Sequence, residues 1–173
     1  ACGVKEHVVI DATQTFYNDC VRYLIFANVL RNNAYPLCVS AERIFQAKAV
    51  AEFARQSGAQ AIAHGSTGAG NDQVRFDMVF QVMCPELKII TPVRDESLKR
   101  DQEIAFLQAN GIEGDWPKAR YSINQGLWGT SIGGAETLQS DGYLPEDAFP
   151  TPLTQSPGEN STLEFVAGEP VAL

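Results

Sequence analysis

The apolar residues of this chain change their spacing several times between positions 7 and 110, and each change predicts a new element. Short apolar runs predict buried strands, because the side chains on both faces of a parallel sheet are covered. Such runs occupy 7–10, 61–63 and 87–90. Apolar residues three and four positions apart share one face of a helix. This spacing predicts helices over 13–30, 40–57, 71–84 and 99–110.

The predicted helices have recognisable ends. Ser40 and Asn71 favour the N-cap position, where the side chain accepts a hydrogen bond from the first helical turn. Gly58 and Gly111 follow the second and the last helix, as glycine commonly does after a helix C-terminus. In the second helix, the side chains expected to face the core are those of Ile44, Ala47, Ala51 and Ala54.

The predicted order is strand, helix, helix, strand, helix, strand, helix. Alternating elements of these lengths predict an α/β fold with a parallel, Rossmann-like sheet covered on both faces. Ligands of such sheets bind at the carboxyl ends of the strands. The loop 64–70 follows a predicted strand and is therefore expected at that edge, and residues 92–95 are predicted to form a loop after the next strand.

The pattern changes after position 116. Residues 121–134 are rich in small, hydroxylated and glycine residues and contain few periodic apolar ones. The tail contains one short strand candidate, at 162–166, and the prolines Pro145, Pro150, Pro152, Pro157 and Pro170. We therefore expect a first domain over 1–116 and the truncated beginning of a second domain over 117–173.

Composition narrows the possible functions. The chain has 173 residues, of which 45% are hydrophobic and 20% charged, as is typical of folded globular proteins. Acidic residues outnumber basic ones by 21 to 13, which argues against nucleic-acid binding because that function needs a basic surface. No apolar run approaches the roughly 20 residues that cross a bilayer, so no membrane partner is expected.

The cysteines and histidines argue against a metal site. The four cysteines form no C-x-x-C pair, which is typical of reduced thiols in a cytoplasmic protein. Only His7 and His64 are present, so a metal site built on histidines is not expected. No histidine–acid pair or Ser-His-Asp set is evident, and no catalytic acid or base is predicted.

The stretch 61–77, AIAHGSTGAGNDQVRFD, holds the strongest candidate site. A strand, a glycine loop and a helix start follow one another here, and this order gathers unpaired backbone N–H groups at one point. Asn71 and Arg75 share a helix face beside Asp72, and Thr67 adds a hydroxyl. Such a set suits a zwitterionic ligand next to a phosphate. The alternative is a surface loop with a capped, salt-bridged helix, and the pattern lacks the terminal Gly-Lys-Ser/Thr of a P-loop.

Residues 64–76, HGSTGAGNDQVRF, resemble the H-G-x-T-G-x-G-N-D-Q-V-R-F signature of argininosuccinate synthases. Further stretches resemble the same family: YPLCVSAER at 35–43, LKIITPVR at 87–94, YSI at 121–123 and LWGTSI at 127–132. The resemblance covers nearly the whole chain. The chain has no counterpart of the family's S-G-G-L-D-T-S loop, and it departs from the family's residues at Cys38, Val39, Ala69 and Gly133.

The resemblance implies an N-type ATP pyrophosphatase fold, of the adenine nucleotide alpha-hydrolase-like kind, followed by the start of an α+β synthetase domain. It also implies an ATP-dependent carbon–nitrogen ligase of arginine biosynthesis. ATP adenylates the ureido oxygen of citrulline with release of pyrophosphate, and the aspartate amine then displaces AMP to give argininosuccinate. Mg²⁺ is expected with ATP, and a homotetramer is expected for the full-length parent. We expect this chain to be a segment that lacks the pyrophosphate loop and much of the C-terminal domain.

The resemblance assigns roles to residues at three ligands. The residues implied for citrulline are Tyr35, Ser40, Asn71, Arg75, Ser122 and Ser131. Those implied for aspartate are Thr67, Asn71 and Asp72, and those implied for ATP are His64, Gly65, Ser66, Gly68 and Gly70. Two other functions stay open: a non-catalytic segment that binds citrulline or aspartate, and another N-type ATP pyrophosphatase.

Overall fold

The computed structural model describes residues 3–114, 121–151, 158 and 160–172. The chain forms two compact units, the first made of residues 1–21 and 40–98 and the second of residues 22–39 and 99–173. Among the described residues, no helix is both long and apolar enough to cross a membrane.

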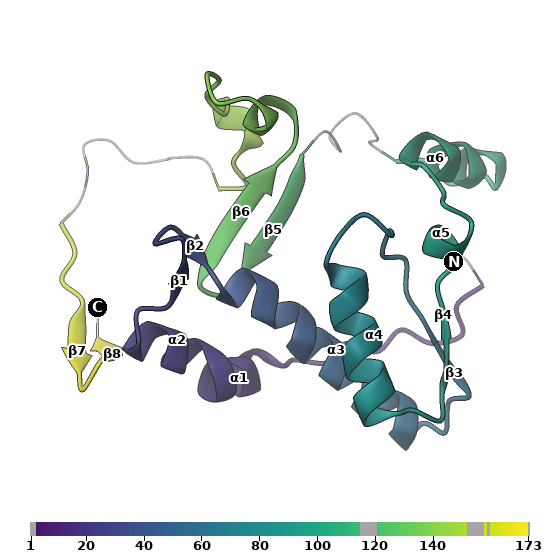
Figure 1. Cartoon of the computed structure of the whole chain (residues 1–173), viewed down its shortest axis with the longest axis horizontal. Coiled ribbons are helices and arrows are strands. Elements are labelled where there is room, and N and C mark those ends of the chain that lie inside the picture. The colour runs from purple at the N-terminus through teal and green to yellow at the C-terminus, as the bar shows by residue number, and fades with distance from the viewer. Residues whose placement is uncertain (1–2, 115–120, 152–157, 159, 173) are drawn as a thin grey trace. The chain divides into compact units, whose positions relative to one another are not determined.

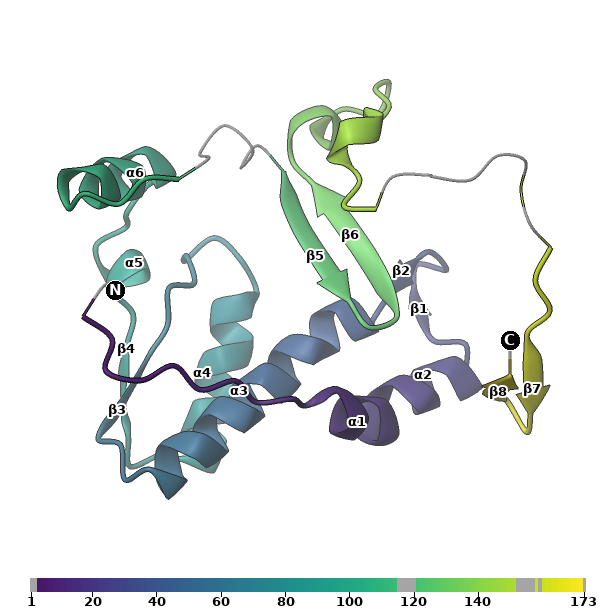
Figure 2. The ribbon, with the colours of Figure 1, turned by 180° about the vertical axis from the view of Figure 1, so that it is seen from behind.

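The first unit is built on a pair of parallel strands, β3 (Ala61–Ala63) and β4 (Lys88–Ile90), which lie side by side in Figures 1 and 2. In their register Ile62 lies opposite Ile89. The unit also contains most of α3 (Cys38–Gln56), the connecting helix α4 (Asp72–Met83), and α5 (Pro92–Asp95). The parallel pair and its helical connection confirm the predicted α/β class, whereas the covering of the sheet on both faces stays a prediction.

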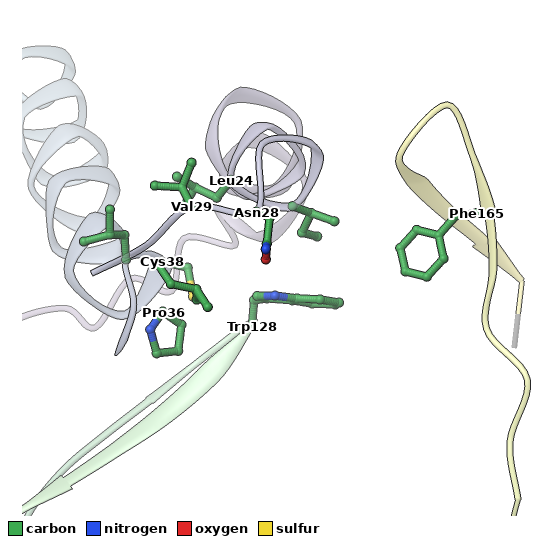
Figure 3. Close-up of a pocket in the computed structure, with 10 residues that line it drawn as sticks. Leu24, Asn28, Val29, Pro36, Cys38, Trp128 and Phe165 are labelled. Atoms are coloured by element: carbon green, nitrogen blue, oxygen red, sulfur yellow. The ribbon is translucent and has the colours of Figure 1, made fainter. Parts of the chain in front are cut away.

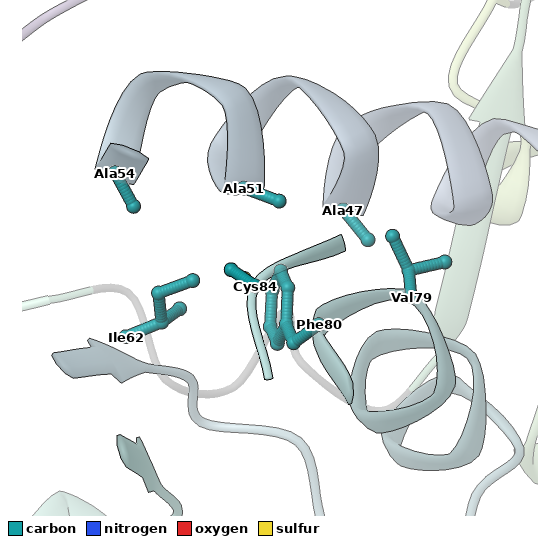
Figure 4. Close-up of a cluster of buried hydrophobic side chains, with 7 residues drawn as sticks. All are labelled: Ala47, Ala51, Ala54, Ile62, Val79, Phe80 and Cys84. Carbon is teal, nitrogen blue, oxygen red and sulfur yellow. The ribbon is translucent and has the colours of Figure 1, made fainter. Parts of the chain in front are cut away.

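The core of the first unit is packed around the inner face of α3 (Figure 4). Its buried side chains are those of Ala47, Ala51, Ala54, Ile62, Val79, Phe80 and Cys84. The three alanines recur at four- and three-residue steps, so they form one stripe along α3. This confirms the predicted inward face, and Ile44 packs against it while staying partly exposed.

Three local predictions for the first 40 residues are wrong. Within the described residues, the run 7–10 pairs with no other strand, and Val9 is 80% exposed. An apolar run forms no sheet unless a neighbouring strand satisfies its backbone hydrogen bonds. The helix predicted over 13–30 ends at Phe26 and consists of α1 (Thr13–Phe16), a π-helical turn η1 (Tyr17–Val21) and α2 (Arg22–Phe26). Helix α3 begins at Cys38, so Ser40 lies inside its first turn and not at its N-cap.

In its described residues, the second unit contains α2, α6 (Arg100–Ala109) and three antiparallel strand pairs. The strand pairs are β1 (Leu30–Arg31) with β2 (Tyr35–Pro36), β5 (Ser122–Gly126) with β6 (Gly129–Gly133), and β7 (Glu164–Val166) with β8 (Glu169–Ala172). Two 3₁₀ turns, η3 (Ala135–Leu138) and η4 (Glu146–Ala148), follow the second pair. The helix over 99–110 and the strand near 162–166 are confirmed, with bounds shifted by one or two residues.

A hollow of about 300 Å³ lies within the second unit between α2, the β5–β6 turn and β7 (Figure 3). Its lining is mostly apolar and includes Leu24, Val29, Trp128 and Phe165. Trp128 stands at the turn of the hairpin and reaches this hollow because the next residue, Gly129, allows the backbone to come close to Pro36.

Replacing Gly129 with alanine is expected to destabilise this hairpin by roughly 1–3 kcal/mol. Gly129 has a φ of +151°, and an added Cβ would lie 2.8 Å from Cγ of Pro36. A urea unfolding curve of the Gly129→Ala variant measures the loss. The control is Gly58→Ala, which also has a positive φ, +68°, but has open space around it. A loss no larger than that of Gly58→Ala would contradict the role of the Pro36 contact.

Candidate functional site

The glycine loop 64–71 connects the end of β3 to the start of α4. The N–H of His64 donates to the carbonyl of Ile90 at 3.1 Å, so the β3–β4 ladder continues one residue into the loop. The loop therefore leaves the carboxyl edge of the parallel pair, as the sequence predicts. Helix α4 begins at this same carboxyl edge. As at every helix start, its first N–H groups have no acceptor within the helix.

His64 pairs with the acid Asp77, so the expectation of no histidine–acid pair is wrong, and both of its ring nitrogens are hydrogen-bonded. The two residues are 13 positions apart and no local pattern relates them. Its Nε2 lies 3.1 Å from Oδ1 of Asp77, and its Nδ1 accepts from the N–H of Ser66 at 3.3 Å. An acceptor at Nδ1 and a carboxylate at Nε2 together favour the neutral tautomer with the proton on Nε2. Asp77 in turn accepts a hydrogen bond from Arg94, which follows β4.

The two partners of Asp77 set its ionisation. Burial raises the pKa of the Asp77 carboxyl, but the hydrogen bond and positive charge of Arg94 and the hydrogen bond of His64 outweigh it. The pKa is therefore lower than in an unfolded chain. A carboxyl of this kind stabilises the folded state above its ordinary pKa of about 4, and the stabilisation is lost as the pH falls through the lowered value.

We expect the unfolding free energy of the unsubstituted chain to fall as the pH drops from 5 to 3, and to fall less steeply in Asp77→Asn. The difference in slope stays below about 1.4 kcal/mol per pH unit, the limit for one proton. Urea unfolding at a series of pH values measures both slopes. Glu86→Gln is the control, because Glu86 has 59% of its side chain exposed and pairs with Arg55, away from the Asp77 network. Equal slopes for Asp77→Asn and the unsubstituted chain would contradict the assignment.

A second group of charges lies where α3 meets the start of α4. Asp72 accepts from Nη1 of Arg75 at 2.7 Å, and Nε of Arg43 lies 3.6 Å from its other oxygen. Burial raises the pKa of Glu42, Arg43 opposes this rise, and Asp72 adds to it. The Asp72 carboxylate therefore lies between the guanidinium groups of Arg43 and Arg75. A carboxylate can bind the ammonium group of an amino acid, and a guanidinium can bind its carboxylate.

These charges border a hollow of about 400 Å³ in the first unit. Its polar side includes the predicted site residues His64, Gly65, Ser66 and Asp72, and Phe76 and Phe80 form part of its apolar side. Arg43 and Gln46 also line it, and sequence reasoning did not assign them a role. Arg43 stands in the stretch 35–43 that carries the family resemblance, so its position there was the available signal.

The other predicted residues lie outside the lining of this hollow. Thr67, Gly68, Gly70 and Asn71 are exposed in the loop, and the guanidinium of Arg75 is paired with Asp72. Asn71 occupies the N-cap position of α4, but its side chain makes no capping hydrogen bond, because its backbone is already helical (φ −82°, ψ −12°). The position was predicted correctly and the capping bond was not.

Three predicted citrulline residues belong to the second unit. Tyr35 lies on β2, Ser122 on β5 and Ser131 on β6. Ser131 is opposite Asn124, which is two residues from Ser122. Residues two apart on a strand share a face, so Ser122 and Ser131 stand diagonally on the same face of the hairpin. Within the described residues, no group of three His, Cys, Asp or Glu side chains is placed to hold a metal ion.

A glycine loop and a helix start at the carboxyl edge of parallel strands are features of α/β domains of the Rossmann-like class. Residues 1–113 match the family described as "Arginosuccinate synthase N-terminal HUP domain", which agrees with this class. The chain belongs to the argininosuccinate synthase family.

Curated relatives resemble the chain over its whole length. The argininosuccinate synthases of Sulfurisphaera tokodaii and Saccharolobus solfataricus are each 39% identical to it over 172 residues. That of Methanocaldococcus jannaschii is 39% identical over 174 aligned residues. Each alignment covers 99% of this chain and 44% of the relative, so the chain spans less than half the length of these proteins.

Proposed function

We propose that this chain is part of an argininosuccinate synthase, which joins citrulline and aspartate at the expense of ATP through a citrullyl-adenylate. The products are argininosuccinate, AMP and pyrophosphate. The observation that carries the proposal is the placement of HGSTGAGNDQVRF at the carboxyl edge of a parallel strand pair, in a chain 39% identical to three proteins of that name. In this proposal 1–116 is nucleotide-binding and 117–173 begins the synthetase domain.

The loop and the helix start are proposed to hold the nucleotide. His64, Gly65, Ser66, Gly68 and Gly70 line the adenylate in this assignment. Backbone N–H groups that are already oriented stabilise charge on the α-phosphate without rearranging during the reaction. Adenylation and displacement require two amino acids and a nucleotide to be aligned in one site, and this alignment is the main task of these residues.

The charged group beside the loop is proposed to hold the amino acids. Thr67, Asn71 and Asp72 bind aspartate, whose ammonium complements the Asp72 carboxylate. Asn71 and Arg75 bind citrulline, and the planar guanidinium of Arg75 complements its carboxylate. Tyr35, Ser40, Ser122 and Ser131 are also assigned to citrulline, on the family resemblance alone. A citrulline carboxylate would compete with Asp72 for Arg75, since Nη1 of Arg75 already donates to Oδ1 of Asp72 at 2.7 Å.

Three further features of the parent enzyme are proposed with the function. Mg²⁺ enters with ATP, because this ion is usually held by substrate phosphates and only one or two protein carboxylates. A homotetramer and a cytoplasmic location remain predictions for the parent.

An assay of the purified chain tests the proposed function. The chain is mixed with ATP, Mg²⁺, citrulline and aspartate, and the release of AMP and pyrophosphate is measured. Release that requires both amino acids supports the ligase. Calorimetric binding of citrulline or aspartate without release supports the amino-acid-binding alternative. Release that does not require citrulline would contradict the ligase and favour another pyrophosphatase.

A further inference from the structure

Arg94 joins the segment after β4 to the helix that follows the glycine loop. It lies in α5, where the sequence predicts a loop, and 72% of its side chain is shielded from solvent (28% exposed). Its Nη1 donates to Asp77 and, at 3.0 Å, to Oε1 of Gln73, and its Nη2 lies 3.1 Å from Oγ1 of Thr91. Thr91 is 2% exposed and donates to Asp95 at 2.7 Å, so the base of this arrangement is fixed.

The first connection from Arg94 to the loop passes through Gln73. Arg94 occupies the side-chain oxygen of Gln73, which leaves the amide nitrogen to donate to the carbonyl of Gly68. The Cγ of Arg94 also lies 3.7 Å from the place where a Cβ on Gly68 would stand. In a trans peptide the C=O and the next N–H point in opposite directions. Fixing the Gly68 carbonyl towards Gln73 therefore directs the N–H of Ala69 to the other side of the loop.

The second connection passes through Asp77 and His64. Arg94 binds one oxygen of Asp77, and the other oxygen lies 3.1 Å from Nε2 of His64. With the proton on Nε2, the free Nδ1 accepts from the N–H of Ser66. Arg94 thus acts on both ends of the segment 66–68, at the Ser66 N–H and at the Gly68 carbonyl. A planar guanidinium suits this task, because its donors lie in a rigid fork.

We propose that Arg94 is a positioning residue that fixes the glycine loop in the conformation used for the nucleotide. Arg94 is not among the residues that line the hollow, so its effect on the ligand passes through Gln73, Asp77 and His64. The inference rests on the proposed function, because it assigns the nucleotide to this loop. A loop ordered before binding loses less conformational freedom on binding, and this raises its affinity.

The test compares three substitutions. Arg94→Met retains much of the aliphatic stem beside Gly68 and removes every donor. The double variant Asp77→Asn with Arg94→Met also removes the carboxylate that would otherwise be left without its cation. Arg94→Lys retains the charge but has one ammonium group in place of the fork. Arg55→Met is the matched control, since Arg55 is 61% exposed and pairs with Glu86 at 3.9 Å in the same unit.

Backbone NMR relaxation without nucleotide, calorimetric titration with ATP and urea unfolding are the three measurements. In Arg94→Met and in the double variant, order parameters of residues 66–70 are expected to fall from about 0.85 to below about 0.6. Those of Val79 and Phe80 stay unchanged, and the Kd for ATP rises about tenfold. Arg94→Lys is expected to recover the unfolding midpoint relative to Arg94→Met, but not the loop order or the ATP affinity. If the role of Arg94 were purely structural, the three properties would recover together.

The outcomes separate this inference from the proposed function. Unchanged loop order in both donor-deficient variants, or full recovery of loop order and ATP affinity in Arg94→Lys, would overturn the positioning role. If Arg94→Met does not fold, the double variant decides. If the unsubstituted chain does not bind ATP, the proposed function fails for this chain, and the relaxation measurement still decides whether Arg94 orders the loop.

Discussion

Arg75→Ala is expected to weaken citrulline binding about 30-fold while changing the Kd for ATP less than about twofold. A charge-assisted hydrogen bond contributes about 2 kcal/mol, and each 1.4 kcal/mol corresponds to a factor of ten in affinity. Arg75 is proposed to hold the citrulline carboxylate, and the nucleotide is assigned to the loop residues 64–70, which precede Asn71 in the sequence. Calorimetric titrations with citrulline and with ATP measure the two affinities separately.

The fold should tolerate this substitution. The Arg75 side chain is 26% exposed, and the Asp72 carboxylate that it leaves keeps Arg43 at 3.6 Å. Exposed and half-exposed ion pairs contribute about 1 kcal/mol or less, so the change in unfolding free energy should be small. Arg75→Lys should give an intermediate citrulline affinity, because an ammonium cannot bind a carboxylate through two parallel N–H donors.

Arg55→Ala is the control for a lost surface arginine, and it should bind both ligands normally. An equal loss of citrulline and ATP affinity in Arg75→Ala would mean that Arg75 has a structural role, through its bond to Asp72. A normal citrulline affinity would contradict its assignment to that substrate.

Phe80→Ala is expected to lower the unfolding free energy of the first unit by about 3–4 kcal/mol. Phe80 is 3% exposed and stacks on Phe76 with 6.0 Å between ring centroids. The alanines of α3 that face it are too small to fill the space it would leave (Figure 4). The surrounding structure therefore cannot close the cavity, and the lost contacts are not replaced. Urea unfolding followed by circular dichroism measures the loss.

Phe53→Ala is the matched control for Phe80→Ala, because Phe53 belongs to the same unit and is 40% exposed. The unfolding free energy of Phe53→Ala should fall by about 1 kcal/mol, since much of the Phe53 ring is already in contact with water. Phe80→Leu should fall between the two, because it leaves a smaller cavity. Equal losses for Phe80→Ala and Phe53→Ala would contradict the assignment of Phe80 to the core.

Local sequence patterns predicted the structure correctly where an element is stabilised by contacts between residues close in the sequence. The alanine stripe of α3 and the helix after the glycine loop could be predicted, because neighbours on a helix are three or four residues apart in the sequence. The loop between β3 and α4 could be predicted in the same way. Of the implied site residues, His64, Gly65, Ser66 and Asp72 line one hollow.

Prediction failed where a structure depends on a partner distant in the sequence. The run 7–10 has the composition of a strand but pairs with no other strand in the described chain. The hairpin of β5 and β6 was missed because its residues are small and hydroxylated, and it forms through their pairing with each other. Ser40 lies inside α3, which begins two residues earlier, shortly after β2 ends.

The sequence by itself determined the family, the α/β class and the glycine loop, because motifs, apolar spacing and turn residues are local properties of the chain. Only the tertiary structure decided which side chains hold that loop. Arg94 lies 17 residues from Asp77 and 21 from Gln73, and no periodicity relates these positions. They meet because parallel pairing of β3 with β4 brings the segments after both strands to the same edge of the sheet.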